Sequence, residues 1–192
     1  MMISQDLFTR FQQRLTTAGG ECHLVEKLDD AANVIATHSA LEKRRLIVPP
    51  RFSELHPWGN IVPLLEAKGI QIEEARSPSD VADAPAGLSH AELAVAETGS
   101  ILIAENSLAA RVVSMLTLTH FALVRADDLM AVLDTVGERL QQLTRVGPDQ
   151  RHYISLVTGP SRTADIERTL TIGVQGPRAL CVLLVKDWKT RS

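Results

Sequence analysis

Residues 158–167 read TGPSRTADIE and stand between an apolar run at 153–157 and a helical pattern that ends near Gly173. Gly159 tolerates positive φ and Pro160 fixes its own φ, so the pair predicts a tight turn after a strand. The pattern then predicts a helix, whose first N–H groups have no intrahelical partner and favour an anion. Arg162 adds a planar guanidinium that can bind a carboxylate or phosphate. The stretch therefore predicts a strand, a turn and a ligand-binding helix N-terminus.

Outward from this stretch, apolar runs typical of strands alternate with helical patterns along the whole chain. The runs lie at residues 22–26, 45–48, 70–74, 93–96, 101–104, 121–124, 153–157 and 179–185. The helical patterns lie at 4–17, 29–38, 64–67, 108–116 and 127–143. Thr98-Gly99 between two apolar strands predicts a tight hairpin or a bulged strand. Alternation of this kind predicts an α/β fold in three layers, α/β/α, around a parallel or mixed central sheet.

Length and composition favour one domain over residues 1–192. The chain has 192 residues, of which 45% are hydrophobic and 22% charged, enough for one substantial core. Within it, residues 1–20 are expected to form an N-terminal docking helix. Residues 76–86, rich in Pro, Ser, Ala and Asp, are expected to form a surface connection.

Charge and hydropathy exclude several classes of partner. The formal net charge is −3 with both signs interspersed, so no basic face for nucleic acid is expected. No apolar run reaches the length of a membrane span, and the N-terminal residues lack the pattern of a signal peptide. A cytoplasmic location is the expectation.

Two polar turns are expected to form one ligand site. Glu97, Thr98, Gly99 and Ser100 stand at the rim of a predicted buried sheet, as do residues 159–163. Ligands of open α/β sheets bind where the loops after neighbouring strands converge, so a pocket is predicted between the two turns if their strands are neighbours. Two carboxylates at 165 and 167 would repel a dianion. The pocket is thus expected to hold a small carboxylate on Arg162 or a neutral polar group.

Three segments carry a family resemblance. TGPSRTADIE at 158–167, GVQGP at 173–177 and AETGS at 96–100 resemble, in order and spacing, the signature of the lactate utilization protein C family (LutC/YkgG, LUD domain). The resemblance implies a fold related to the NagB/RpiA/CoA-transferase group. It also implies a part in oxidising L-lactate to pyruvate with iron–sulfur partner proteins. Gln175 departs from the pattern, since relatives commonly carry histidine there; glutamine cannot shuttle protons near neutral pH.

Each candidate site residue also has a structural interpretation. Glu97 is a candidate general base or nucleophile, or a strand-end carboxylate bonded to backbone N–H groups or to an arginine such as Arg111. His120 is a candidate proton carrier, or a histidine hydrogen-bonded at a strand edge. The remaining candidates are predicted to bind ligand, although several could instead cap a helix. They are Thr98, Gly99, Ser100, Gly159, Pro160, Ser161, Arg162, Thr163, Asp165 and Gln175.

No metal or cofactor site is predicted in this chain. Cys22 and Cys181 are far apart and outside any C-x-x-C pair, so they are expected to be small buried hydrophobes. Two thiols cannot supply the four that an iron–sulfur cluster takes, so any clusters are expected on partner proteins. The six histidines show no H-E-x-x-H spacing, and neither G-x-G-x-x-G nor a P-loop occurs.

Three functions follow as hypotheses. The first is a component of a lactate-oxidising assembly, whose partners would be iron–sulfur proteins and a small carboxylate, with a homo-oligomer as a further option. The second is an acyl- or CoA-transferring enzyme with Glu97 as the nucleophile. The third is a non-catalytic ligand-binding subunit, in which Arg162 would hold a carboxylate without turnover.

Overall fold

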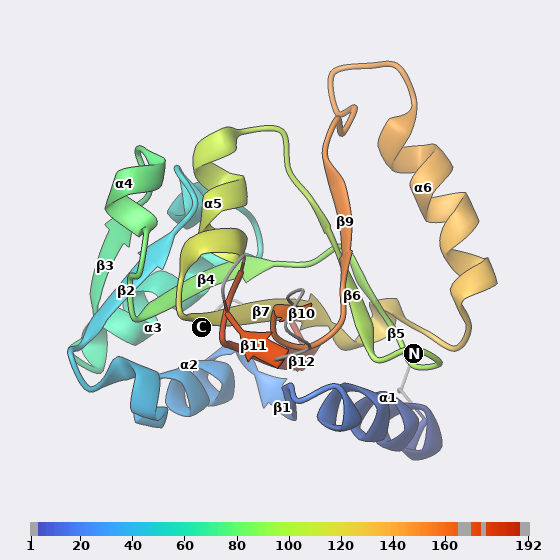
Figure 1. Cartoon of the computed structure of the whole chain (residues 1–192), viewed down its shortest axis with the longest axis horizontal. Helices are drawn as coiled ribbons and strands as arrows, with labels where there is room; N and C mark the ends of the chain where they lie inside the picture. The colour runs from blue at the N-terminus through green and yellow to red at the C-terminus, as the bar shows by residue number, and fades with distance from the viewer. Residues whose placement is uncertain (1–3, 165–169, 174–175, 189–192) are drawn as a thin grey trace.

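A six-stranded, all-parallel sheet organises the chain, as the computed structural model shows for residues 4–164, 170–173 and 176–188 (Figure 1). Its strand order is β1-β12-β7-β4-β2-β3, so the C-terminal strand lies between the first strand and β7. The strands are β1 (Glu21–Lys27), β2 (Arg45–Val48), β3 (Gln71–Glu74), β4 (Ala86–His90), β7 (Thr119–Arg125) and β12 (Ala179–Asp187). The α/β prediction is confirmed in this form.

A smaller mixed sheet lies against one face of the main sheet. Its order is β8-β5-β6-β9, with β5–β6 and β6–β9 antiparallel and β5–β8 parallel. Its strands are β5 (Leu93–Val95), β6 (Ser100–Ala104), β8 (Leu129–Met130) and β9 (Ile154–Val157). The hairpin predicted around Thr98-Gly99 is confirmed as β5–β6. Every residue of β6 is buried, as its continuous apolar character predicts.

Helices cover both faces of the parallel sheet. They are α1 (Gln5–Thr17), α2 (Leu28–Thr37), α3 (Ile61–Ala67), α4 (Pro78–Val81), α5 (Leu108–Leu116) and α6 (Val136–Thr144). On one face, α2 and α3 pack on side chains such as Phe121 and Leu183. On the other face, α1 and the small sheet share a core with Val182 and Leu184. The N-terminal helix therefore packs on the core.

The docking of α1 follows from its sequence. Phe8, Phe11 and Leu15 recur at helical spacing and are buried in the core under the small sheet. The hydroxyl of Ser4 accepts the N–H of Leu7, which caps the start of the helix.

No helix among the described residues is long and apolar enough to cross a membrane.

Two expectations about secondary structure were wrong. The helix predicted after Ser161 is instead a two-stranded antiparallel sheet of β10 (Arg162–Ala164) and β11 (Leu170–Ile172). The β-branched residues Thr163, Thr171 and Ile172 favour strands, and backbone pairing prevails over the capping pattern. Ser161 is therefore followed by a strand, and the ligand site was expected at the N-terminus of a helix there.

The second error concerns the helix predicted from Asp127, which begins only at Val136. Leu129 and Met130 instead pair with β5 as strand β8, and the carbonyl of Met130 accepts the N–H of Ala96. Leu129 is buried in the core as a result. A tertiary strand pairing here overrides a local helical pattern.

One strand of the main sheet, β4, lies in a stretch for which no element was predicted. The interval at 76–86 expected as a surface connection contains the short helix α4 and reaches the start of β4 at Ala86. β4 reads AGLSH and shows no clear alternation. A Cβ at Gly87 would lie 2.6 Å from Cγ2 of Thr117, so a small residue is required where the chain around α5 approaches the sheet.

Candidate functional site

The two polar turns predicted to converge do lie side by side. Their strands β6 and β9 are hydrogen-bonded neighbours, with Ile101 opposite Val157. At the end of this pair, the hydroxyl oxygens of Ser100 and Thr158 are 2.5 Å apart. The predicted adjacency of the turns is confirmed.

A third turn joins them. The N–H of Ser161 donates to the carbonyl of Pro177 over 2.9 Å, and its carbonyl accepts the N–H of Gly173 over 2.9 Å. A Cβ at Gly176 would lie 2.9 Å from Cβ of Ser161, so the two segments approach closely. We call residues 97–100, 158–162, 173 and 176–177 the signature corner. All three segments that carried the family resemblance contribute to it.

The C-terminal end of α1 packs on the signature corner. Gly99 has a φ of 70°, and a Cβ there would collide with the backbone of Leu15. Gly159 has a φ of 69°, and its Cβ would lie 2.6 Å from the carbonyl oxygen of Ala18. Nη2 of Arg162 donates to that same carbonyl. A cation that binds the last carbonyls of a helix stabilises its C-terminus, so Arg162 has a structural role here.

Other predicted site residues also have partners inside the chain or lie outside the described residues. The Glu97 carboxylate accepts the N–H of Leu133 over 2.9 Å, which matches its interpretation as a backbone-bonded strand-end carboxylate. Oγ1 of Thr98 is buried without a hydrogen-bond partner among the described residues, and Pro160 is buried. Asp165, Gln175 and the side chain of Thr163 lie outside what the structure describes. A ligand role for the signature corner stays a prediction.

His120 lies inside the main sheet, on β7. It is 1% exposed, and its Nε2 lies 2.8 Å from the hydroxyl of Ser89 on the neighbouring strand β4. Burial lowers its pKa to about 4, so the ring is neutral near pH 7. A buried neutral ring with a hydroxyl partner corresponds to the interpretation as a hydrogen-bonded structural histidine, although it lies within the sheet and not at its edge.

A cavity of about 360 Å³ lies at the carboxyl ends of β2 and β4. This is the edge where open α/β sheets bind ligands, and the volume suits a small molecule. We call it the carboxyl-edge cavity. Its lining residues are Pro49, Pro50, Arg51, Phe52, Glu54, Leu55, His90, Glu105, Ser107, Ala110 and Arg151.

Two residues that line this cavity carry buried polar atoms without partners. Nδ1 of His90 and Nε of Arg151 are buried and make no hydrogen bond within the described part of the chain. Such atoms are rare in folded proteins because each costs about 1–3 kcal/mol, and they call for a ligand or water. The second cavity arginine, Arg51, is already paired with Glu54 over 2.5 Å. Arg151 is therefore the better placed of the two arginines to hold an anion.

The N-terminus of α5 adds to this positive potential. Ser107 is the N-cap of α5 and lines the cavity together with Ala110 in the first turn. The side chain of Ser107 makes no capping bond, so it leaves the first N–H groups of the helix free to face an anion.

Two glutamates beside the cavity have opposite pKa shifts. Burial raises the pKa of Glu105, although His90 and Arg151 act against it. Burial also acts to raise the pKa of Glu92, but His90 and Arg139 outweigh it and hold the pKa at about 2. Arg139 lies 2.5 Å from the Glu92 carboxylate. Glu92 is thus a fixed anion behind His90, whereas Glu105 is a carboxyl group able to gain a proton inside the cavity.

The sequence analysis missed this cavity. None of its lining residues belongs to the predicted site set. One signal was available: Pro49-Pro50-Arg51 directly follows a predicted strand, at the position where ligand-binding loops of α/β sheets occur. His90 gave no such signal because strand β4, which it ends, was not predicted.

Comparison with known proteins places the chain in a family. The model of the LUD domain matches residues 8–185, nearly the whole described chain. The chain belongs to the LUD domain family. The family resemblance read from the three signature segments is thereby confirmed.

Several named proteins are similar to part or most of this chain. Lactate utilization protein C of Bacillus velezensis is 30% identical over 113 residues, which are 59% of this chain and 47% of the relative. Lactate utilization protein C of Halalkalibacterium halodurans is 27% identical over 170 residues, 85% of this chain and 71% of the relative. The uncharacterized protein YkgG of Escherichia coli is 27% identical over 164 residues. The match to the first of these spans about half of that relative's length.

A solved structure shares the LUD domain fold. The crystal structure of a DUF162 family protein from Deinococcus radiodurans has a TM-score of 0.66 and 24% sequence identity, covering 94% of this chain and 96% of that chain. The likeness supports the parallel sheet flanked by helices. A wider relation to the NagB/RpiA/CoA-transferase group stays a prediction.

Proposed function

We propose that this chain is a component of an L-lactate utilization system and binds a small carboxylate, such as lactate or pyruvate, in the carboxyl-edge cavity. The family and the names of its relatives support the first part. The observation that carries the second is that His90 and Arg151, which both line a small-molecule-sized cavity, each carry a buried nitrogen without a hydrogen-bond partner among the described residues.

The chemistry of the cavity suits a hydroxy or keto acid. Arg151 and the N–H groups at the start of α5 attract a carboxylate. His90 supplies a nitrogen for the neighbouring hydroxyl or carbonyl group, and Glu105 in its protonated form donates a hydrogen bond instead of repelling the ligand. Phe52 and Leu55 line the apolar side. This combination of a few polar groups and an apolar wall is typical of small-ligand sites.

Calorimetric titration of the purified chain with L-lactate and with pyruvate tests the site. We expect Arg151→Gln to weaken binding at least about tenfold, a loss of 1.4 kcal/mol or more, because it removes the charge and keeps most of the side-chain length. Arg162→Gln is the matched control in the signature corner and should leave the affinity unchanged. The reverse result would move the ligand to the signature corner. No binding of either acid to the unmodified chain would overturn the carboxylate proposal.

The electrons of lactate oxidation would leave through other proteins. The two cysteines lie on opposite faces of the main sheet, Cys22 towards α1 and Cys181 towards α2, and a cluster usually takes four thiolates. Iron–sulfur clusters are therefore assigned to partner proteins. We expect the isolated chain to carry no iron and not to reduce a dye with lactate. Stoichiometric iron with lactate-dependent dye reduction would contradict this part.

A further inference from the structure

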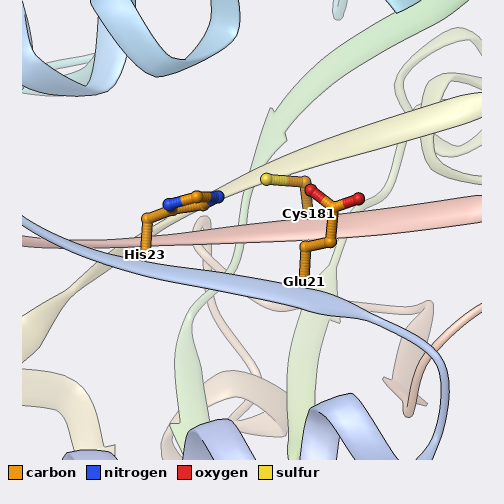
Figure 2. A group of neighbouring side chains, drawn as sticks. All are labelled: Glu21, His23 and Cys181. Carbon is orange, nitrogen blue, oxygen red and sulfur yellow. The ribbon is translucent and has the colours of Figure 1, made fainter. Parts of the chain in front are cut away.

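Three potential metal ligands gather at the amino-terminal edge of the main sheet. They are the carboxylate of Glu21, the imidazole of His23 and the thiol of Cys181, and their ligand atoms all lie within 4.8 Å of one another. Figure 2 shows the three side chains on the same side of the two strands and directed toward a common point. The separation in sequence hides this cluster, because Cys181 lies far from the other two.

The parallel pairing of β1 with β12 brings them together. Glu21 is the direct partner of Cys181, and His23 is two residues further along β1. Residues two apart in a strand point to the same face, so all three side chains project toward the layer of α2. Cys181 belongs to the core on that face, whereas Cys22 points to the opposite core beneath α1.

The cluster combines a buried inner ligand with a solvent-accessible outer one. Cys181 is 1% exposed, His23 is half-buried and the Glu21 side chain is 53% exposed. An ion bound here would be coordinated by the thiolate and the imidazole on its buried side. Its remaining coordination position would be open to water. The ring of His23 makes no hydrogen bond among the described residues and is free to turn its nitrogen toward an ion.

Electrostatics also favour a cation at this point. The fold places the carboxylate of Glu21 beside the buried thiol of Cys181, because the two residues are direct partners on β1 and β12. A divalent ion bound between them would displace the thiol proton, since thiolates are the form that binds metals, and would offset the repulsion between the thiolate and the carboxylate.

A fourth polar residue orients the cluster. Nδ1 of His38 accepts the N–H of Ala40 over 3.1 Å, so in the neutral ring Nε2 carries the proton. Nε2 lies 3.5 Å from Oε2 of Glu21. A protonated nitrogen cannot bind a metal, so His38 is a positioning residue that steers the carboxylate. Ligating carboxylates in metal sites commonly have such an outer partner.

We infer that Glu21, His23 and Cys181 bind one Zn²⁺ ion, with water in the fourth position. Thiolate, imidazole and carboxylate are the ligand types that Zn²⁺ takes in tetrahedral sites. The ion ties β1 to β12 at the amino-terminal edge of the sheet. The carboxyl-edge cavity is at the opposite edge, so this metal site is independent of the proposed carboxylate site.

Metal binding to the full chain tests the inference. After removal of metals with a chelator, we expect about one Zn²⁺ per chain by equilibrium dialysis with elemental analysis, and an unfolding temperature that rises with added Zn²⁺. Co²⁺ in place of Zn²⁺ should give the near-ultraviolet charge-transfer band of a cobalt–thiolate bond. His23→Ala and Cys181→Ser should each weaken binding at least about a hundredfold, and His38→Gln about tenfold. Cys22→Ala, which changes the other buried cysteine, should bind as the unmodified chain does.

Several results would overturn the inference. They are no stoichiometric Zn²⁺ on the unmodified chain, a cobalt form without the thiolate band, and equal affinity in His23→Ala. Because Cys181 is buried, its serine variant could fail to fold, and circular dichroism checks this. In that event His23→Ala and Glu21→Gln, both changed at accessible side chains, decide the outcome alone.

Discussion

The hydroxyl oxygens of Ser100 and Thr158 lie 2.5 Å apart, although 58 positions of chain separate the two residues. The contact joins the turn that precedes β6 to the turn that follows β9. It stands where the signature corner meets α1. The segments that define the family signature thus hold the N-terminal helix on the sheet.

Removing this contact should destabilise the fold. Ser100 is 1% exposed, so Ser100→Ala leaves the Thr158 hydroxyl without its buried partner, and a loss of about 1–2 kcal/mol is expected in urea unfolding. Thr158→Val should lose a similar amount. In the double variant the losses should not add, because one interaction is removed twice. Full additivity would show that the two hydroxyls do not interact.

The glycines that face α1 should not tolerate a side chain. Gly99→Ala and Gly159→Ala each combine a positive φ with a Cβ that meets the backbone of α1 or the residue after it, so each should lose at least about 2 kcal/mol of unfolding free energy. Gly137→Ala in α6 is the matched control, since nothing lies within 4 Å of its Cβ. That variant should gain up to about 1 kcal/mol. Equal effects at all three positions would contradict the packing of α1 on the corner.

The stability of the fold should rise with pH through the range in which His120 titrates. Burial lowers its pKa from 6.5 to about 4, so between these values the unfolded chain binds the proton and the folded chain does not. The His120 contribution to the free energy of unfolding is therefore fully present above about pH 6.5 and is lost as the pH falls toward 4. About 2 kcal/mol should disappear between about pH 6.5 and 5.

Urea unfolding of His120→Gln checks this dependence, since glutamine does not titrate. The slope over the same pH range should become shallower by the His120 contribution. Glu92 has a pKa of about 2, below its usual 4.5, so its contribution to stability is lost only at lower pH. It therefore does not affect the comparison of the two slopes. An unchanged slope in the variant would show that the buried ring is not the cause.

Glu105 should tune carboxylate binding if the carboxyl-edge cavity holds the ligand. Its pKa is raised by burial, so lowering the pH neutralises it and should strengthen lactate binding. Glu105→Gln should strengthen binding at neutral pH by up to about tenfold and weaken its pH dependence, because the repelling charge is gone. Titration at several pH values measures both effects. Weaker binding in the variant would mean that Glu105 acts as an anion toward its ligand.

Local patterns predicted the helix at 4–17, the strands at 45–48, 101–104 and 179–185, and the meeting of the β6 and β9 turns. These segments have strong helical periodicity or continuous apolar character. Both patterns provide apolar side chains whose burial in the core stabilises the element directly. The predictions failed where pairing with a distant strand decided the structure. Strands β8, β10 and β11 are formed by segments whose sequence patterns had predicted helices. The sequence of β4 has no clear alternation from which a strand could be predicted.

The sequence by itself determined the family, the α/β class and the residues that form the signature corner, because turn glycines, prolines and apolar runs act over a few positions of chain. Only the tertiary structure decided what those residues contact. It joined Arg162 to the end of α1, brought Arg151 and His90 to one cavity, and set Cys181 beside Glu21. The physical reason is that a parallel sheet brings together strands far apart in the chain, and the register of each pairing is set by the packing of the whole core rather than by local sequence.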